Sequence, residues 1–273
     1  MANECKTDSV YFAYKKNDNI PKELSLRHCH DKYEILYVVS GTGKYVVEGI
    51  EYPVSPGTLM IFPPLAYHLV QIDSGAPYER YLLHFDRGAV LSDLSDAMAV
   101  IDENAKLSGA FYTRTSLNYA LTSTFEKFDT VNLLPESGRD MYSRLLLGEI
   151  INYLSLEPTA FFFDDRLDLG TKVIRYLNLN VERPISLDQL SKRFFVSKYY
   201  LCRAFKERNG ISIHGYITQK RVTYAKQLIE AGESASNAAY KVGFGDYSAF
   251  YRAYLKIMGR APTQKEGREK HDV

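Results

Sequence analysis

The stretch ISLDQLSKRFFVSKYYLCRAFKERNG, residues 185–210, constrains the fold more strongly than any other part of the chain. Ser186 followed three residues later by Gln189 is the pattern that begins a capped helix. Ser197 can cap a second helix, and Gly210 is the residue type that commonly ends one. Two short helices separated by a brief break predict a helix-turn-helix unit in this stretch.

A second stretch, SASNAAYKVGFGDYSAFYRAYLKIMG, repeats this design over residues 234–259. A helix over 235–241 is followed by a turn, and Asp246 can cap the next helix, in which Phe250 should point inward. Between the two pairs, residues 212–232 have the apolar periodicity of one longer helix. The C-terminal third is therefore expected to be all-α, with two helix-turn-helix units joined by a helix.

The outward faces of the second helix in each pair are basic and aromatic, as a surface that reads the DNA major groove requires. The first face holds Lys198, Tyr199, Cys202, Arg203 and Lys206, and the second holds Tyr247, Ser248, Tyr251 and Arg252. Arg203 is the strongest single candidate, because a bidentate contact of arginine with guanine contributes about 1–3 kcal/mol of base discrimination. The alternative for Arg203 is a surface ion pair.

Charge is unevenly distributed along the 273 residues of the chain. Residues 1–169 contain 15 Lys and Arg against 24 Asp and Glu, a net charge of −9, whereas residues 170–273 contain 19 against 9, a net of +10. A basic C-terminal third on an acidic body indicates a polyanion-binding module joined to a different domain. Solvated basic helices without a nucleic-acid partner are the alternative.

The N-terminal part has the pattern of short strands. YEILYVV, GKYVVEGIEYPV, GTLMIFPP, YHLVQID and YERYLLHF are rich in β-branched and aromatic residues and are separated by Gly, Pro, Asp or Ser. Such spacing over residues from about 10 to 86 predicts a small barrel or sandwich. Residues 87–157 lack this regular spacing of separating residues. Within them, residues 138–156 should form an amphipathic helix that either pairs with a second copy or packs on its own barrel. Residues 157–165 are expected to be a linker.

The segment HCHDKYE concentrates groups that bind metals. In a regular strand His28, His30 and Glu34 share a face, and His68 should lie on a neighbouring strand. Three imidazoles and one carboxylate can hold a divalent transition metal. The same side chains could instead line the pocket of a small effector or be structural polar groups, while His84 is expected to be a core or edge residue.

The segments VSKYYLCRAFKERNGISIHGYITQKRVTYAKQLI and VGFGDYSAFYRAYLKIMGRAP resemble the DNA-binding domain of the AraC/XylS family of bacterial transcription regulators. The resemblance implies two helix-turn-helix units that enter successive major grooves. It also implies that Lys198, Lys206 and Lys256 contact phosphates and that the other outward residues read bases. The chain departs from the family at Ala235 and Ala238, where larger aliphatic residues are usual, so the second unit should have a thin core.

The spacing of the N-terminal histidines resembles the cupin signature. The first motif consists of His28-x-His30, three further residues and Glu34, and it is followed by Gly41. The second motif ends at His68. This second motif lacks its usual glycine and the later asparagine. Cupin barrels include metal enzymes, and they also form the N-terminal sensing domain of many AraC-type regulators. The implied fold is α+β. A cupin-like domain for effector binding and dimerisation (1–160, barrel about 10–86, helices about 87–156) precedes an AraC-type DNA-binding domain (161–273).

The function predicted from these features is sequence-specific regulation of transcription, controlled by a small molecule such as a sugar, without enzymatic activity. The predicted effector-binding residues are Arg27, His28, His30, Glu34, Tyr37 and His68, with Tyr45 and Tyr67 as further candidates. No cofactor is required, but a divalent metal could occupy His28, His30, Glu34 and His68. The expected partners are double-stranded DNA, the effector, a second copy of the chain and RNA polymerase.

The predicted location is the cytoplasm, without membrane attachment. No secretion signal is expected, because the N-terminal residues lack a basic segment followed by an apolar one. The apolar runs fall short of the roughly 18 residues of a membrane span, and the three cysteines do not suggest a disulfide framework. Two rival functions remain open at this point. One is a metal-dependent cupin enzyme with an appended DNA-binding domain, and the other is an architectural DNA binder without an effector.

Overall fold

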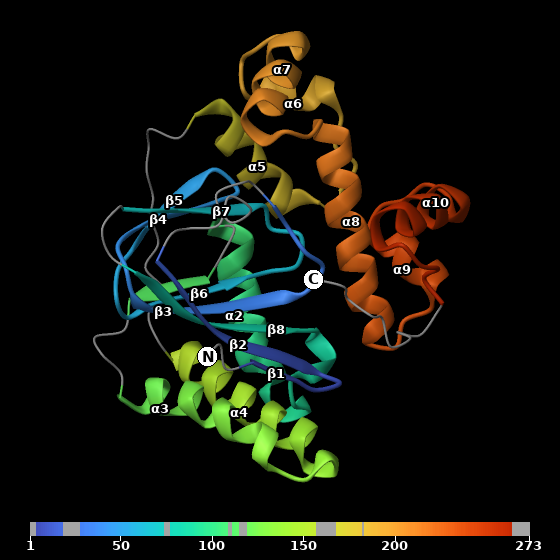
Figure 1. The fold of residues 1–273 in the computed structure, drawn as a ribbon. Coiled ribbons are helices and arrows are strands. Elements are labelled where there is room, and N and C mark those ends of the chain that lie inside the picture. The colour runs from blue at the N-terminus through green and yellow to red at the C-terminus, as the bar shows by residue number, and fades with distance from the viewer. Residues whose placement is uncertain are drawn as a thin grey trace.

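The computed structural model describes residues 4–18, 28–73, 77–108, 111–114, 119–156, 168–181 and 183–263. A β-structure with helices against one side is followed by a C-terminal group of helices, so the fold is α+β, as predicted (Figure 1). The expected linker over 157–165 and the candidate effector residue Arg27 lie outside the described residues.

The strands form two antiparallel sheets that face each other. They are β1 (Glu4–Lys6), β2 (Val10–Asn17), β3 (Tyr33–Ser40), β4 (Gly43–Val47), β5 (Ile50–Val54), β6 (Thr58–Phe62), β7 (His68–Ile72), β8 (Tyr78–Phe85) and β9 (Phe111–Arg114). One sheet has the order β1-β2-β8-β3-β6-β9, and the other has the order β5-β4-β7. Each of the five segments predicted to be strand-like contains at least one strand.

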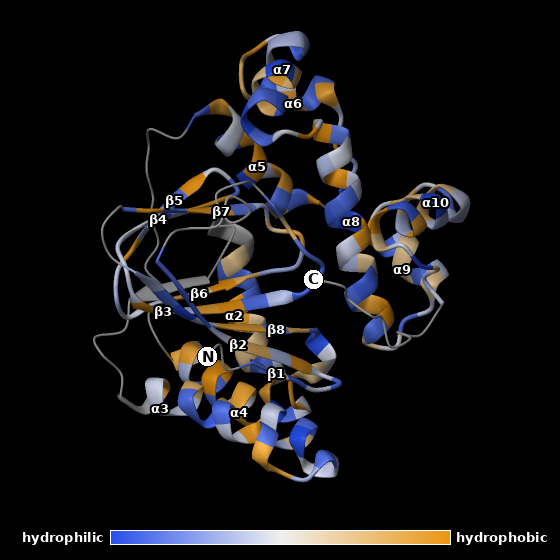
Figure 2. Ribbon diagram, in the orientation of Figure 1, coloured by the Kyte–Doolittle hydropathy of each residue, from blue (hydrophilic) through white to orange (hydrophobic). Residues whose placement is uncertain are grey.

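Successive side chains of β3 point alternately into two hydrophobic cores, one on each face of the strand. Leu36 and Val38 point between the sheets, where they pack with aromatic residues of the other strands. Ile35 and Tyr37 point to the other side, towards the helices. Glu34 has the same parity as Leu36, so its carboxylate enters the space between the sheets. Strands β3 and β6 are largely hydrophobic, as strands covered on both faces must be (Figure 2).

Three helices lie against the six-stranded sheet: α2 (Ser95–Ser108), α3 (Tyr119–Lys127) and α4 (Glu136–Leu156) (Figure 1). On α4, Leu147, Ile151 and Leu154 are fully buried and share a core with Phe12 of β2. The amphipathic helix predicted over 138–156 therefore packs its apolar face on its own barrel.

The C-terminal part is built from short capped helices. They are α5 (Leu169–Asn180), α6 (Leu187–Arg193), α7 (Lys198–Asn209), α8 (Ile213–Glu230), α9 (Ala235–Lys241) and α10 (Tyr247–Met258). Ser186 makes the predicted capping box with Gln189, and Ser197 caps α7. Gly210 ends α7 with a φ of 69°, a left-handed conformation that suits glycine.

Helix α8 joins two helix-turn-helix units, α6–α7 and α9–α10, each of which has its own core (Figure 1). The first core includes Leu190, Leu201 and Phe205. The second contains small residues at its centre, because the fully buried Ala238 and its neighbour Ala239 pack there with Phe250. The second core is thus thin, as its sequence suggests, yet both helices of the unit are formed.

Candidate functional site

Three histidines and a glutamate converge between the two sheets. Glu34 lies on β3, and the register of the neighbouring strand β8 places His84 directly opposite it. His30 Nε2 lies 2.6 Å from Glu34 Oε2, and the Nε2 atoms of His68 and His84 each lie 3.5 Å from the same oxygen. Glu34 is 7% exposed and His68 only 2%. One buried carboxylate oxygen is therefore surrounded by three imidazole nitrogens.

Backbone carbonyls orient two of these imidazoles. His30 Nδ1 lies 3.0 Å from the carbonyl oxygen of Lys32, and His68 Nδ1 lies 2.8 Å from that of Ala66. A carbonyl oxygen can only accept, so both Nδ1 atoms carry a hydrogen and donate it. The Nε2 atoms of His68 and His84 are buried and, within the described part of the chain, have no hydrogen-bond partner. These two nitrogens are thus left facing Glu34.

The cluster changes the acid–base properties of its members. Burial alone would raise the pKa of the Glu34 carboxyl, but the surrounding imidazoles outweigh burial and hold that pKa well below its usual range. Burial alone would lower the pKa of His30, but its hydrogen bond and attraction to Glu34 outweigh burial and raise that pKa. The site therefore favours a carboxylate beside a positive charge, which an imidazolium or a metal ion can supply.

The cavity beside this cluster is small, with a volume of about 30 Å³. It is lined by His28, Glu34, Tyr45, His68, Val70, Arg80 and Leu82. Tyr45 and Tyr78 both belong to the core between the sheets, and their hydroxyl groups lie 2.9 Å apart. Such a cavity has room for a water or an ion, whereas pockets for small organic molecules measure roughly 300–1,000 Å³.

The predicted effector-binding residues do not all meet at this cavity. His28 forms an isolated antiparallel bridge with His68, and their rings are 4.4 Å apart. Tyr37 lies on the opposite face of β3, where it stacks on Phe125 and shares a hydrogen bond with Thr122. The prediction that Tyr37 lines the same pocket as the histidines is therefore corrected, because alternate residues of a strand point to opposite faces.

Two further residues differ from their expected roles. Tyr67 donates a hydrogen bond from its hydroxyl to Gln219 on α8 at 3.0 Å, so it forms a contact between the domains instead of lining the barrel. His84 belongs to the cluster around Glu34, although the sequence suggests only a core or edge residue. Its position follows from the pairing of β8 with β3, and the periodicity of either strand alone does not reveal that pairing.

The outward face of α7 is open to a partner. Its exposed candidate residues are Lys198, Tyr199, Arg203 and Lys206, while Cys202 is half-buried. Arg203 Nε lies 3.2 Å from Glu207 Oε1 on the next turn, and Lys198 Nζ lies 2.6 Å from Asp188 Oδ1. Exposed ion pairs of this kind contribute about 1 kcal/mol or less, so both cations can exchange these partners for DNA.

Helix α10 presents a similar face. Its exposed candidate residues are Ser248, Tyr251, Arg252 and Lys256. Tyr247 is half-buried, because its ring packs beside that of Phe250 with the ring centres 5.8 Å apart. Asp246 caps the helix by accepting a hydrogen bond from the backbone N–H of Ala249. This cap sets the start of the helix that presents these residues.

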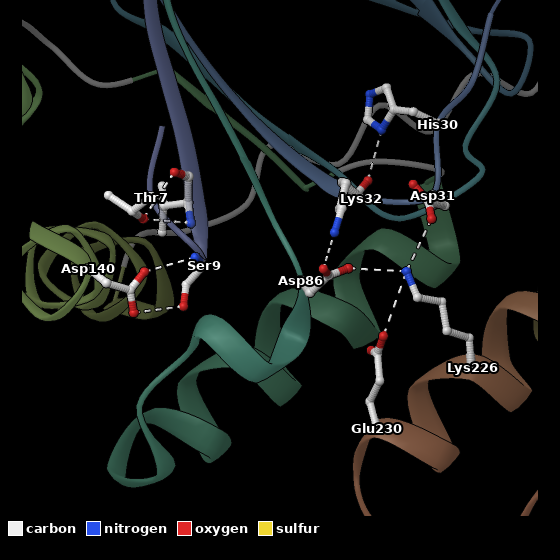
Figure 3. A network of polar contacts seen from close by, with 10 residues as sticks. Thr7, Ser9, His30, Asp31, Lys32, Asp86, Asp140, Lys226 and Glu230 are labelled. Carbon is white, nitrogen blue, oxygen red and sulfur yellow. Dashed lines mark hydrogen bonds and ion pairs between the residues drawn. The ribbon is translucent and has the colours of Figure 1, made fainter. Parts of the chain in front are cut away.

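Helix α8 is attached to the β-structure through a buried lysine. Lys226 is 3% exposed, and its Nζ lies 3.2 Å from both Asp31 Oδ2 and Asp86 Oδ1 and 3.6 Å from Glu230 Oε1 (Figure 3). Burial alone would lower the pKa of this ammonium group, but the carboxylates of Asp86 and Asp31 outweigh burial and raise that pKa. A buried charge needs such partners, so this cluster ties α8 to the β-structure.

A second buried charged residue, at the tip of the β4–β5 hairpin, also connects the β-structure to α8. Glu48 and Gly49 form the two-residue turn with positive φ angles of 51° and 83°. Glu48 is 1% exposed, and its Oε1 lies 2.9 Å from Lys220 Nζ on α8. The hydroxyl of Tyr216, one helical turn earlier, lies 3.0 Å from Glu48 Oε2. Charged groups from both domains therefore hold one face of α8 at two points.

A cleft of about 580 Å³ lies between the two domains. Its polar and aromatic lining includes Tyr33, Arg87 and Asp102 from the N-terminal side and Lys220, Tyr224 and Gln227 from α8. The volume falls in the range of pockets that bind small organic molecules. Among the helices of the described ranges, none is both long enough and apolar enough to span a membrane.

Comparison with known proteins gives matches in both parts of the chain. Residues 20–101 match the family described as AraC-like ligand binding domain, and residues 190–267 match the helix-turn-helix domain family. The uncharacterized HTH-type transcriptional regulator YdiP of Escherichia coli K12 is 34% identical over 261 residues, which cover 89% of this chain and 81% of that protein. The HTH-type transcriptional activator RhaS of Escherichia coli O139:H28 is 24% identical, with 89% and 88% covered.

Among solved structures, ToxT from Vibrio cholerae is similar with a TM-score of 0.41 and 13% identity, covering 94% of this chain and 97% of that one. The family assignment depends on the sequence relatives and on the two matched domains. The chain belongs to the AraC/XylS family of HTH-type transcription regulators, with a ligand-binding domain at the N-terminal end and a DNA-binding helix-turn-helix domain at the C-terminal end.

Proposed function

We propose that this regulator reads two successive major grooves with α7 and α10, and that the ligand-binding domain controls their placement by holding α8. The observation that carries the proposal is the contrast between the faces of the DNA-binding domain. The outer faces of α7 and α10 are exposed, whereas α8, which joins the two units, is docked through the buried charges of Lys226 and Glu48. A ligand that favours one docked arrangement can thereby change DNA affinity.

The proposed base readers lie on the outward faces of the two recognition helices. On α7 they are Tyr199, Cys202 and Arg203, and on α10 they are Tyr247, Ser248, Tyr251 and Arg252. Because Cys202 and Tyr247 are half-buried, we propose that only their exposed atoms contact bases and that neither side chain inserts deeply into a groove. Lys198, Lys206 and Lys256 are proposed to contact phosphates, which position the protein without specifying sequence.

Replacing Arg203 by Ala is expected to relax base preference at one position of the DNA site, at a cost of about 1–3 kcal/mol for the preferred base. The measurement is a set of binding titrations with duplexes that differ at single positions, taken from a selection on random sequences. Lys206→Ala is the matched control on the same exposed helix. It should weaken all duplexes alike and reduce the slope of affinity against salt by about 1. A uniform loss with Arg203→Ala would contradict the assignment.

For an organic effector, we propose the cleft between the domains as the binding site. The barrel cavity of about 30 Å³ cannot admit a sugar without rearrangement of Tyr45 and Tyr78, whereas the cleft of about 580 Å³ can. Its cationic, anionic and aromatic lining suits a small polar molecule. Because Tyr33 and Gln227 contribute from different domains, such a ligand would stabilise the docked arrangement.

The remaining partners are proposed from the surface of the N-terminal domain and from the family. Met141 and Leu145, one turn apart on α4, are 53% and 50% exposed, and they offer a surface for a second copy of the chain. Contact with RNA polymerase and a cytoplasmic location fit a regulator that acts on bacterial DNA.

A further inference from the structure

We propose that His30, Glu34, His68 and His84 form a binding site for a divalent transition metal, and that the segment His30–Lys32 transmits its occupancy to Lys226 on α8. The metal site is argued from its own geometry. Its regulatory consequence rests on the proposed function, in which the docking of α8 controls DNA binding.

The first argument is the convergence of donor atoms. One donor atom from each of His30, Glu34 and His84 can be chosen so that all three lie within 4.8 Å of one another. His68 adds a fourth donor, with its Nε2 3.5 Å from the same Glu34 oxygen. Ions such as zinc are bound by nitrogen and oxygen donors at about 2.0–2.2 Å, so small side-chain adjustments would bring these atoms into range.

The second argument is that two of the candidate metal-ligating nitrogens lack a hydrogen-bond partner among the described residues. The Nε2 atoms of His68 and His84 are buried and, over the described residues, make no hydrogen bond. A purely structural cluster would be expected to satisfy such atoms, because a buried polar atom without a partner costs about 1–3 kcal/mol. The Nδ1–H groups of His30 and His68 are held by backbone carbonyls, which is the arrangement that supports metal-bound histidines.

The donor set also limits the kind of ion. Three imidazole nitrogens and one carboxylate suit zinc, nickel, iron or manganese, whereas magnesium and calcium prefer oxygen ligands. The adjoining cavity of about 30 Å³ can hold an ion with a water. The set differs from the one that the sequence spacing suggests, because His84 on β8 takes the place of His28.

The third argument is the connection from this cluster to the DNA-binding domain. His30 donates to the backbone of Lys32, whose ammonium group pairs with Asp86 (Figure 3). Asp86 and Asp31, the residue between His30 and Lys32, both pair with Lys226 (Figure 3). A shift of His30 onto a metal would therefore act directly on the carboxylates that hold α8.

The test begins with full-length, untagged protein that is stripped with chelator and titrated with zinc or nickel chloride. We expect one ion per chain by calorimetry and elemental mass spectrometry, and no comparable binding of magnesium. His84→Gln should lower the affinity by at least about 100-fold, since even outer partners of metal ligands are worth 10–100-fold. His28→Gln should have a much smaller effect, and His214→Gln, at an exposed site on α8, should have none.

The thermal unfolding of each metal-free variant shows whether it is folded. If His84→Gln does not fold, Glu34→Gln, which keeps the shape of the side chain, takes its place with the same expected loss. Failure of the wild-type protein to take up zinc or nickel would overturn the site. So would stoichiometric uptake that both His84→Gln and Glu34→Gln leave unchanged.

The regulatory part is tested with a duplex selected from random sequences. Zinc or nickel should change the affinity of wild-type protein for this duplex, and Lys226→Met should abolish the change. Metal uptake without any effect on DNA affinity would overturn the coupling. Protein that selects DNA but takes up no metal would overturn the metal site and leave the proposed function standing. Metal uptake by protein that selects no DNA would refute the proposed function and leave the site standing.

Discussion

Replacing Lys226 by Met is expected to weaken the docking of α8 on the ligand-binding domain, leaving the contact with Glu48 as its other charged attachment. The substitution keeps most of the side-chain volume but leaves Asp31 and Asp86 without their shared cation. Breaking a buried ion pair from one side costs about 3–5 kcal/mol. Since the side chain of Asp31 is 42% exposed and that of Asp86 is 21% exposed, water can compensate in part, and a cost near the lower end, about 3 kcal/mol, is expected.

Hydrogen exchange measured by mass spectrometry on the full chain can detect this weakened docking. Amide protection should fall in α8 and in the segment around Asp31, while the strands of the six-stranded sheet keep theirs. Lys241→Met is the matched control, because Lys241 pairs with Glu233 at an exposed position on α9. It should change protection very little. Unchanged protection of α8 in Lys226→Met would contradict the role assigned to this lysine.

Neutralising the carboxylates provides a second check on the same contact. If Lys226→Met acts by leaving Asp31 and Asp86 with Lys32 as their remaining nearby cation, adding Asp86→Asn should recover part of the lost protection. An additive further loss would instead indicate that Asp86 stabilises the domain through its pair with Lys32.

The architecture of the DNA-binding domain could be predicted from the sequence because its signals are local. The side chains of Ser186, Ser197 and Asp246 each act on a backbone N–H three residues ahead, so the sequence alone marks where the helices begin. The inward positions of Leu201, Phe205 and Phe250 follow from helical periodicity in the same way.

The histidine cluster could be predicted only in part, because its membership depends on which strands are neighbours. His30 and Glu34 are close in sequence, but His84 reaches them through the register between β3 and β8. Tyr37, three residues after Glu34 on β3, points to the opposite face, which the alternation of side chains along a strand indicates without knowledge of the pairing. Pairing between distant strands depends on tertiary packing, which a single sequence does not display.

The docking of α8 could not be predicted from periodicity. Lys226 lies in a basic helix where exposure is the ordinary state of a lysine, and its burial follows only once Asp31 and Asp86 are brought together by the fold. The opposite net charges of the N-terminal and C-terminal parts are consistent with attraction between the two domains, but they do not identify which residues are in contact. Charge complementarity in a sequence thus suggests that two domains meet without locating the interface.

Replacing Phe250 by Ala is expected to unfold the second helix-turn-helix unit locally. Phe250 is the largest fully buried side chain in the core that contains Ala238 and Ala239. Deletion of a buried phenyl ring costs about 3–5 kcal/mol, and it removes the ring that Phe244, Tyr247 and Tyr254 all contact. The unit has only two short helices packed on one end of α8, so this loss is expected to exceed its local stability.

Two measurements follow from this. Amide protection should be lost in α9 and α10 while α6 and α7 retain theirs, and the footprint on a selected duplex should shrink to the half-site bound by the first unit. Phe205→Ala is the informative comparison, because Phe205 is equally buried but is surrounded by Leu190, Leu201 and Tyr216. The first core keeps these large side chains when Phe205 is removed, whereas the second core has alanines at several of its buried positions, so the loss of protection in the first unit should be smaller. A Phe250→Ala protein that keeps both α10 protection and a full footprint would show that contacts with α8, and not the thin core, hold the second unit together.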